Sequence, residues 1–233
     1  MEDNINSIVI HNCDGDDFPI SNLVHWNTNT EFVSIYFNDI ESVIVKEIKA
    51  SSLVVGCIAW FTNEVIINEL AGLDRGCSII VQKEDFLRPE AGTSKSNIRE
   101  KYKTLKCGLT RFDMVGVAQG MSYCGDPTID PVRCVGFSRN AMKFRPNMHH
   151  KFIVLCDVKN DTENDQLIPV PKSVITGSYN FSVNSTRSRE NIVHIKNDEV
   201  ANAYFDEWGL MLAISEPLDW NADYIEPEWR IGS

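Results

Sequence analysis

Apolar residues recur with two different spacings along the central part of the chain, and these spacings predict alternating helices and strands. Ile40–Ala50 has apolar residues three and four positions apart, which is typical of a helix with one buried face. Ser52–Ala59 is an almost continuous apolar run and indicates a buried strand. Glu64–Leu73 again has helical spacing, and Cys77–Gln82 has the composition of a second strand. Strand, helix and strand in this order predict a right-handed crossover in an α/β sheet.

The second half of the chain contains three further segments with the length of strands. Met148–Leu155 and Ser173–Thr176 are rich in apolar residues, so we expect central strands there. Asn191–Lys196 is expected to return as a strand, followed by a helix over Glu199–Leu212. Lys159–Pro171 is rich in Asp, Asn and Glu and predicts a long, exposed connection between two strands.

Neither end of the chain shows a sustained apolar period. The segment up to Thr30 is expected to be irregular, and the segment after Glu216 is not expected to form regular structure. Aromatic residues near the C-terminus, Trp220, Tyr224 and Trp229, would dock on the domain or on a partner. The predicted organisation is an N-terminal extension, one α/β domain and a C-terminal tail, over residues 1–35, 36–214 and 215–233.

Composition narrows the class of protein. Hydrophobic residues make up 43% of the 233 positions, which is enough for a substantial core. No apolar run approaches the roughly 18 residues that a membrane span needs, and the first four residues include two acidic ones, Glu2 and Asp3, where a secretory signal would be basic. The seven cysteines contain no C-x-x-C pair, which favours free thiols in a reducing compartment. We therefore expect a cytoplasmic protein without a membrane partner.

Charge is unevenly distributed. The net charge of -11 argues against a protein that coats nucleic acid along its whole surface. Arg88–Lys151, however, contains twelve basic and five acidic residues and so carries +7. A basic stretch of this kind is what a phosphate-rich polymer requires. A solvated charged face without a ligand is the alternative.

The candidate chemistry lies next to the strands of the second half. His149 and Lys151 are two positions apart, and on a strand they would share a face, so an imidazole would lie beside a fixed cation. A later apolar run ends in Gly177-Ser178, followed by Asn180. Small residues that leave a strand expose backbone N–H groups, and Ser and Asn add donors that can hold an anion. Together these groups suit a phosphoryl group.

This pattern resembles the HKD signature of the phospholipase D superfamily, especially its small, single-motif nucleases. The matching residues are His149, Lys151, Gly177, Ser178, Asn180 and Glu190. The likeness extends over residues 36–214, where the expected order of strands and helices is similar to that of the family. It implies a mixed β-sheet flanked by helices on both faces, a phospholipase D-like α/β/α sandwich.

The resemblance also implies an activity: a metal-independent phosphodiesterase, first of all a nuclease that cleaves DNA or RNA through a phosphohistidine. His149 would be the nucleophile and the acid, Lys151, Ser178 and Asn180 would stabilise charge, and Glu190 would orient the imidazole. No cofactor or metal ion is expected. Single-motif members pair two subunits around a twofold axis, so a homodimer with a shared site is implied. Effectors of this type also occur in bacterial defence assemblies, which implies a regulatory protein partner.

Five further residues are predicted to bind substrate around this motif. They are Lys143 and Arg145 before it, Arg187 and Arg189 after it, and Trp60 at the end of the strand over 52–59. Ligands in open α/β sheets usually bind at the C-terminal ends of strands, which is where Trp60 falls. An aromatic residue at this position also fits the core, so both interpretations of Trp60 stay open.

One departure from the family pattern concerns its aspartate. At the position where the family has this residue, the chain has Cys156, and Asp157 follows. On a continuous strand Cys156 and Asp157 face opposite ways, so Asp157 replaces the aspartate only if the strand has a bulge. Two other functions therefore stay open, a phospholipase or other small phosphodiester hydrolase, and a catalytically silent subunit that binds nucleic acid or a partner. A gain of activity in Cys156→Asp would favour the silent subunit.

Overall fold

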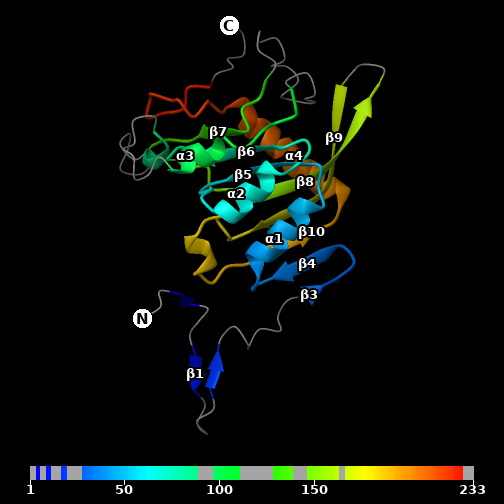
Figure 1. Ribbon diagram of the computed structural model, residues 1–233, viewed down its shortest axis with the longest axis vertical. Coiled ribbons are helices and arrows are strands. Elements are labelled where there is room, and N and C mark those ends of the chain that lie inside the picture. Colours follow the sequence, from blue (N-terminus) through cyan, green and yellow to red (C-terminus); the bar gives the residue numbers. More distant parts are fainter. Residues whose placement is uncertain are drawn as a thin grey trace.

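The computed structural model describes residues 4–5, 9–11, 17–19, 28–88, 97–110, 128–138, 146–162 and 166–227. Within these residues, an eight-stranded mixed sheet lies between helices on its two faces (Figure 1). The predicted fold class is confirmed.

The strand order brings several strand ends to one edge of the sheet. In order, the strands are β3 (Thr28–Asn29), β4 (Val33–Tyr36), β10 (Ile192–Ile195), β9 (Gln166–Gly177), β8 (Lys151–Asp161), β5 (Leu53–Ile58), β6 (Cys77–Gln82) and β7 (Val132–Val135). β5, β6 and β7 are parallel, and the other neighbouring pairs are antiparallel. Because Ile58 pairs with Lys151 and Gly177 with Ile192, the ends of β5 and β9 meet the beginnings of β8 and β10. This edge carries the motif.

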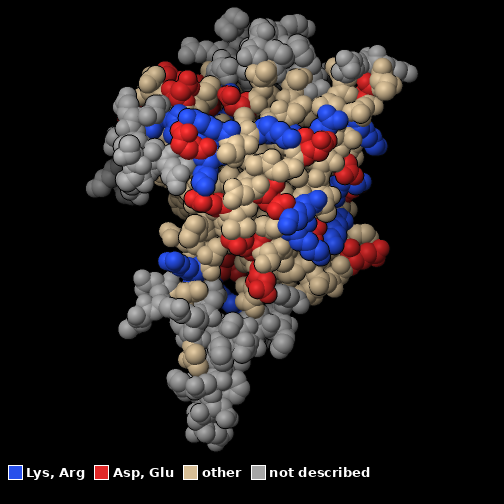
Figure 2. All heavy atoms as spheres, viewed as in Figure 1, with Lys and Arg blue, Asp and Glu red and all other residues tan. Residues whose placement is uncertain are grey.

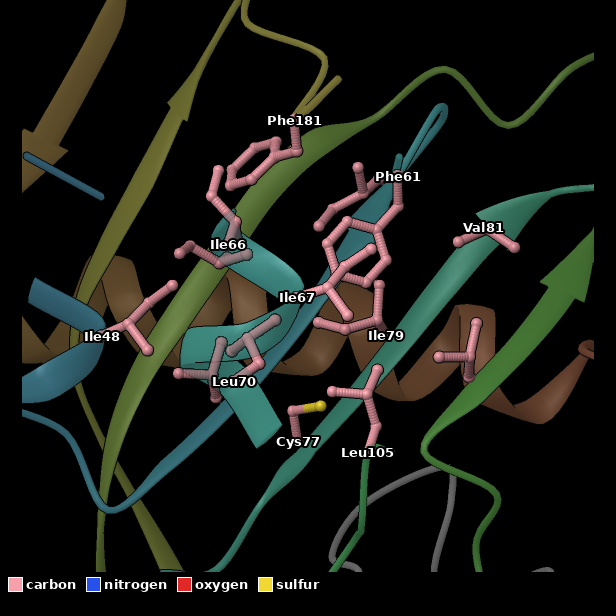
Figure 3. Close-up of a cluster of buried hydrophobic side chains, with 14 of the residues drawn as sticks. Ile48, Phe61, Ile66, Ile67, Leu70, Cys77, Ile79, Val81, Leu105 and Phe181 are labelled. Carbon is pink, nitrogen blue, oxygen red and sulfur yellow. The ribbon is translucent and has the colours of Figure 1, made fainter. Parts of the chain in front are cut away.

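Helices cover the two faces of the sheet separately. α1 (Ile40–Lys49), α2 (Glu64–Ala71) and α3 (Asn97–Tyr102) lie on one face, and α4 (Asp198–Ala213) lies on the other (Figure 1). Figure 3 shows side chains of α2, such as Ile67, against the strands of the first face. Asp85–Leu87 and Asn184–Thr186, both within the described ranges, form short 3₁₀ helices. Alternate residues of β5 and β8 enter the two cores, as period-two side chains must.

The predicted exposed connection over Lys159–Pro171 is wrong. β8 and β9 continue to pair from Cys156 to Asp161 and from Gln166 to Pro171, and they form a hairpin that projects beyond the sheet (Figure 1). The polar composition misled the prediction because most side chains of this hairpin are exposed or only partly buried, so polar residues are tolerated on a paired backbone. β8 also begins at Lys151, so His149 precedes the strand instead of lying within it.

The N-terminal part is more regular than expected. β1 (Val9–His11) and β2 (Asp17–Pro19) pair antiparallel as a separate two-stranded sheet. β3 and β4 join the main sheet through β10, so pairing in that sheet begins at Thr28. Short strands of this kind carry too little apolar periodicity to be recognised from the sequence.

The C-terminal segment, residues 215–227, packs along the β7 edge of the domain. Glu216 and Cys134 exchange two backbone hydrogen bonds of 2.9 Å, and Trp220 is only 4% exposed. Lys83, which is fully buried, forms an ion pair with Glu216 and donates to the carbonyls of Ala222 at 2.9 Å and Tyr224 at 2.7 Å. Of the two open alternatives for Trp220, docking on the domain is therefore the observed one.

Three arginines of the basic stretch also hold this segment. Arg88 pairs with Asp223, Arg99 donates to the Leu218 carbonyl at 2.7 Å, and Arg133 donates to the Ser215 hydroxyl at 2.7 Å. These three charges act within the fold. On the face shown in Figure 2, basic and acidic side chains of the described surface are interspersed. No helix in the described ranges has the length and apolar character that crossing a bilayer requires.

Candidate active site

His149 and Lys151 lie together at the beginning of β8. The Lys151 ammonium nitrogen is 3.1 Å from Nδ1 and 3.3 Å from Nε2 of His149, and it donates to the His149 carbonyl at 3.1 Å. The predicted proximity is found, although His149 lies just outside the strand. The neighbouring His150 points elsewhere, to Glu207 of α4 at 3.0 Å.

Electrostatics favour a neutral imidazole. Burial lowers the pKa of His149, and the nearby Lys151 and His150 lower it further. Burial also lowers the pKa of Lys151, and Glu190 opposes that shift. Lys151 is therefore within electrostatic reach of both His149 and Glu190. A histidine with a lowered pKa keeps a free lone pair at neutral pH, as a nucleophile must.

The second half of the motif is a tight contact between the end of β9 and the beginning of β10. Gly177 comes so close to Asn191 that a Cβ atom would lie 2.2 Å from the Asn191 carbonyl oxygen. The Ser178 N–H donates to this carbonyl at 3.0 Å, and the Asn191 N–H donates to the Ser178 hydroxyl oxygen at 3.0 Å. The Ser178 hydroxyl donates to Glu190. Gly177 is thus required for the approach that links Ser178 to Glu190.

Glu190 has a different contact from the one expected. The resemblance assigns it a hydrogen bond to the imidazole, whereas its carboxylate accepts from Ser178 here. A bond between Glu190 and His149 is not among the contacts within the described part of this single chain. Glu190 acts on the histidine side of the motif through its charge on Lys151.

The loop after Ser178 is held by the beginning of α2, which sequence reasoning did not identify. The N–H groups of Thr62 and Asn63 donate to the Phe181 carbonyl at 3.1 and 2.9 Å, and the Asn63 amide donates to the Tyr179 hydroxyl at 3.2 Å. The Asn180 N–H donates to the Ser185 hydroxyl at 3.2 Å. The position of Asn180 is therefore set by neighbours on both sides.

Trp60 lies beside His149 and Lys151. It follows β5 and is 37% exposed, so the core interpretation is wrong. Its ring lies 5.5 Å from the His149 ring in an edge-to-face arrangement of 85°, and the Lys151 ammonium is 6.0 Å from the indole centroid. Gln82, which was not predicted, supports the same histidine because its side-chain oxygen accepts the Met148 N–H at 2.8 Å.

The predicted arginines lie in the segment after Asn180, and both are exposed. Arg189 donates to the Asn38 side chain at 2.9 Å, and the Arg187 carbonyl accepts the Ile5 N–H at 3.0 Å. Lys143 and Arg145 lie outside the described residues. Within the described ranges, no group of three or more His, Cys, Asp or Glu side chains is arranged to hold a metal ion.

The departure at the family aspartate lies away from this site. Cys156 is 1% exposed and packs in the α4-side core with Phe152 and Val154. A register shift between β8 and β9 occurs at Leu155 and Cys156, and Asp157 beyond it is exposed. Because Cys156 pairs with Leu53, at the opposite end of β5 from Trp60, neither residue reaches His149.

Comparison with known proteins identifies a viral relative. No family model matches the chain. Uncharacterized protein L381 of Acanthamoeba polyphaga mimivirus is 31% identical over 216 residues, which cover 85% of this chain and 71% of the viral protein. The chain belongs to the same family as L381.

Two solved structures are also similar to this chain over most of its length. One is a phospholipase D family member, Nuc from Salmonella typhimurium, with 16% identity and a TM-score of 0.47 over 79% of this chain and 95% of that chain. The other is NucT from Helicobacter pylori, with 14% identity and a TM-score of 0.49 over 79% and 98%.

Proposed function

We propose that this protein is a metal-independent phosphodiesterase, and specifically a nuclease that cleaves DNA or RNA through a phosphohistidine at a site shared by two subunits. The observation that carries the proposal is the meeting of the two motif halves at one accessible sheet edge. There, Lys151 contacts His149, and the charge of Glu190 acts on the Lys151 ammonium. The Glu190 carboxylate in turn accepts a hydrogen bond from Ser178.

The lowered pKa of His149 supports its role as nucleophile. In the proposed reaction, a neutral imidazole nitrogen of one subunit attacks phosphorus, and the bond from phosphorus to the leaving oxygen breaks. The protonated His149 of the second subunit gives its proton to that oxygen. It then takes a proton from a water molecule whose oxygen attacks the phosphohistidine. The phosphorus–nitrogen bond breaks, and both imidazoles return to their starting states.

The cations and donors of the site would stabilise the phosphoryl oxygens. Lys151 supplies a charge beside the attacking imidazole, and Asn180 supplies an amide from a loop that α2 holds in place. Glu190 accepts from Ser178, so this pair would keep the second half of the motif beside Lys151. The exposed Arg187 and Arg189 would contact the polymer beyond the scissile phosphate.

The test is cleavage of single- and double-stranded DNA and RNA in excess EDTA. We expect cleavage by the wild type and a loss of at least about 10²–10⁴-fold in His149→Ala. His150→Ala is the matched control, because this adjacent histidine faces Glu207 and acts on His149 only through its charge, so it should lose far less activity than His149→Ala. Denaturing electrophoresis of protein mixed with ³²P-labelled substrate should reveal an acid-labile adduct. Equal cleavage by wild type and His149→Ala would refute the proposal.

The shared site predicts a further behaviour. If each site needs His149 from both subunits, adding excess His149→Ala to the wild type should reduce its activity as subunits exchange. Sedimentation should show a dimer. A fully active monomer would contradict the shared site while leaving the nuclease activity itself intact.

A further inference from the structure

A buried carboxylate lies behind the indole that contacts His149. The indole Nε1–H of Trp60 donates to Oε1 of Glu84 at 3.1 Å, and Glu84 is only 7% exposed. The centroid of the same indole lies 5.5 Å from that of the His149 ring. Glu84, Trp60 and His149 therefore form a connected series from the protein interior to the motif.

The parallel strands explain how these residues meet. Trp60 lies two residues beyond the end of β5, and Glu84 lies two residues beyond the end of the neighbouring β6. The Gln82 N–H donates to the Ala59 carbonyl at 3.3 Å, and the Ala59 N–H donates to the His150 carbonyl at 2.9 Å. Gln82, Ala59 and His150 lie within two residues of Glu84, Trp60 and His149, so these hydrogen bonds hold the three backbone segments next to one another.

We propose that Glu84 is a positioning residue, whose carboxylate holds the Trp60 indole against the His149 imidazole. This inference rests on the proposed function of His149. A partly exposed tryptophan can rotate about two side-chain bonds, and the imidazole precedes β8 without strand pairing of its own. A carboxylate that is held below the surface and accepts the indole N–H selects one orientation of the ring.

The contacts around His149 show what this orientation contributes. Lys151 lies against the imidazole from its own strand, and Lys151 and His150 are the charged groups that act on it. Glu84 is not among them, so its effect on the histidine passes through the indole. Without that support the imidazole would move away from the attacking geometry, and a displacement of about 1 Å can cost on the order of a hundredfold in rate.

The experiment compares Glu84→Ala, Glu84→Gln, Trp60→Phe and the double variant Trp60→Phe/Glu84→Ala. We expect Glu84→Ala to lower kcat by about tenfold or more with little change in KM, and Glu84→Gln, which keeps an acceptor oxygen, to restore most of it. Trp60→Phe removes the N–H together with the rest of the five-membered ring, so Glu84 has no indole to orient and Glu84→Ala should add no further loss in that background. Glu100→Ala, which removes only a surface ion pair with Lys103, is the control.

A second readout does not depend on cleavage. The pKa of His149, measured by NMR of labelled histidine, should rise toward its ordinary value in Glu84→Ala, where the indole is no longer held against the imidazole, and in Trp60→Phe, where a smaller ring covers it. If the wild type cleaves nothing, this titration still decides the inference. An unchanged His149 pKa in both variants, or losses of kcat that multiply in the double variant, would overturn it. If Glu84→Ala does not fold, Glu84→Leu, which keeps most of the side-chain volume but accepts no hydrogen bond, gives the same decision.

Discussion

Replacing Lys83 by methionine should destabilise the domain strongly, although Lys83 is not part of the proposed site. The Lys83 side chain has no exposed surface, and its ammonium pairs with Glu216, whose side chain is 6% exposed. It also donates to two carbonyls of the C-terminal segment and lies 4.6 Å from the Trp220 ring centroid. Methionine has a similar length, so the change removes charge and donors while leaving most of the packing volume.

The expected cost follows from what the substitution leaves behind. A buried carboxylate without its partner costs about 3–5 kcal/mol, and this is much of the stability of a typical domain. Glu216→Gln in the same background removes the unpaired charge, so the double variant should be more stable than Lys83→Met alone. Burial already raises the pKa of Glu216, and Lys83 lowers it. Without Lys83 this pKa rises further above its unfolded value.

The sign of the pH dependence follows from that shift. A carboxyl whose pKa is raised by folding contributes stability below its unfolded pKa, and this contribution is lost as pH rises through the folded pKa. The cost of Lys83→Met should therefore be largest near neutral pH and smaller in acid. Urea unfolding followed by tryptophan fluorescence, in which Trp220 reports locally, measures the difference. A loss below about 1 kcal/mol at neutral pH, or no relief by Glu216→Gln, would refute the buried pair.

Three further substitutions test other parts of the structure. Gly177→Ala places a Cβ 2.2 Å from the Asn191 carbonyl oxygen, so we expect a loss of about 1–3 kcal/mol in urea unfolding and slower cleavage, whereas Gly209→Ala, with nothing within 4 Å in helix α4, should be neutral or stabilising. Cys156→Asp puts a carboxylate at a 1% exposed position of the core, so it should destabilise by about 3–5 kcal/mol in the same assay, and a gain of activity would contradict this placement. His194 is 1% exposed, and its ring shares a hydrogen bond of 2.9 Å with the Ser173 hydroxyl. Burial lowers the pKa of His194. The stability that neutral His194 contributes is therefore present above the unfolded pKa of about 6.5 and is lost as pH falls through the folded pKa. Unfolding free energies at several pH values should show a weaker decline in acid for His194→Gln, and an identical decline would contradict the assignment.

The sequence by itself determined the local elements and the chemistry of the motif. Helical and strand spacing are properties of neighbouring residues, so α1, α2 and β5 follow from apolar periodicity. The types and spacing of His149 and Lys151 were enough to predict that an imidazole and an ammonium lie together. Periodicity failed where a paired backbone carries polar side chains on both faces, as in the projecting hairpin of β8 and β9.

Only the tertiary structure decided what surrounds the motif. Trp60 and Glu84 are 24 positions apart, and Lys83 and Glu216 are far more distant in sequence. They meet because β5 and β6 are parallel neighbours and because the chain returns along β7 after α4. Because the chain returns along β7, Arg88, Arg99 and Arg133 contact the C-terminal segment. The sequence had placed these three arginines in a basic stretch expected to bind a phosphate-rich polymer. Composition records which charges exist, whereas strand order decides which of them face each other.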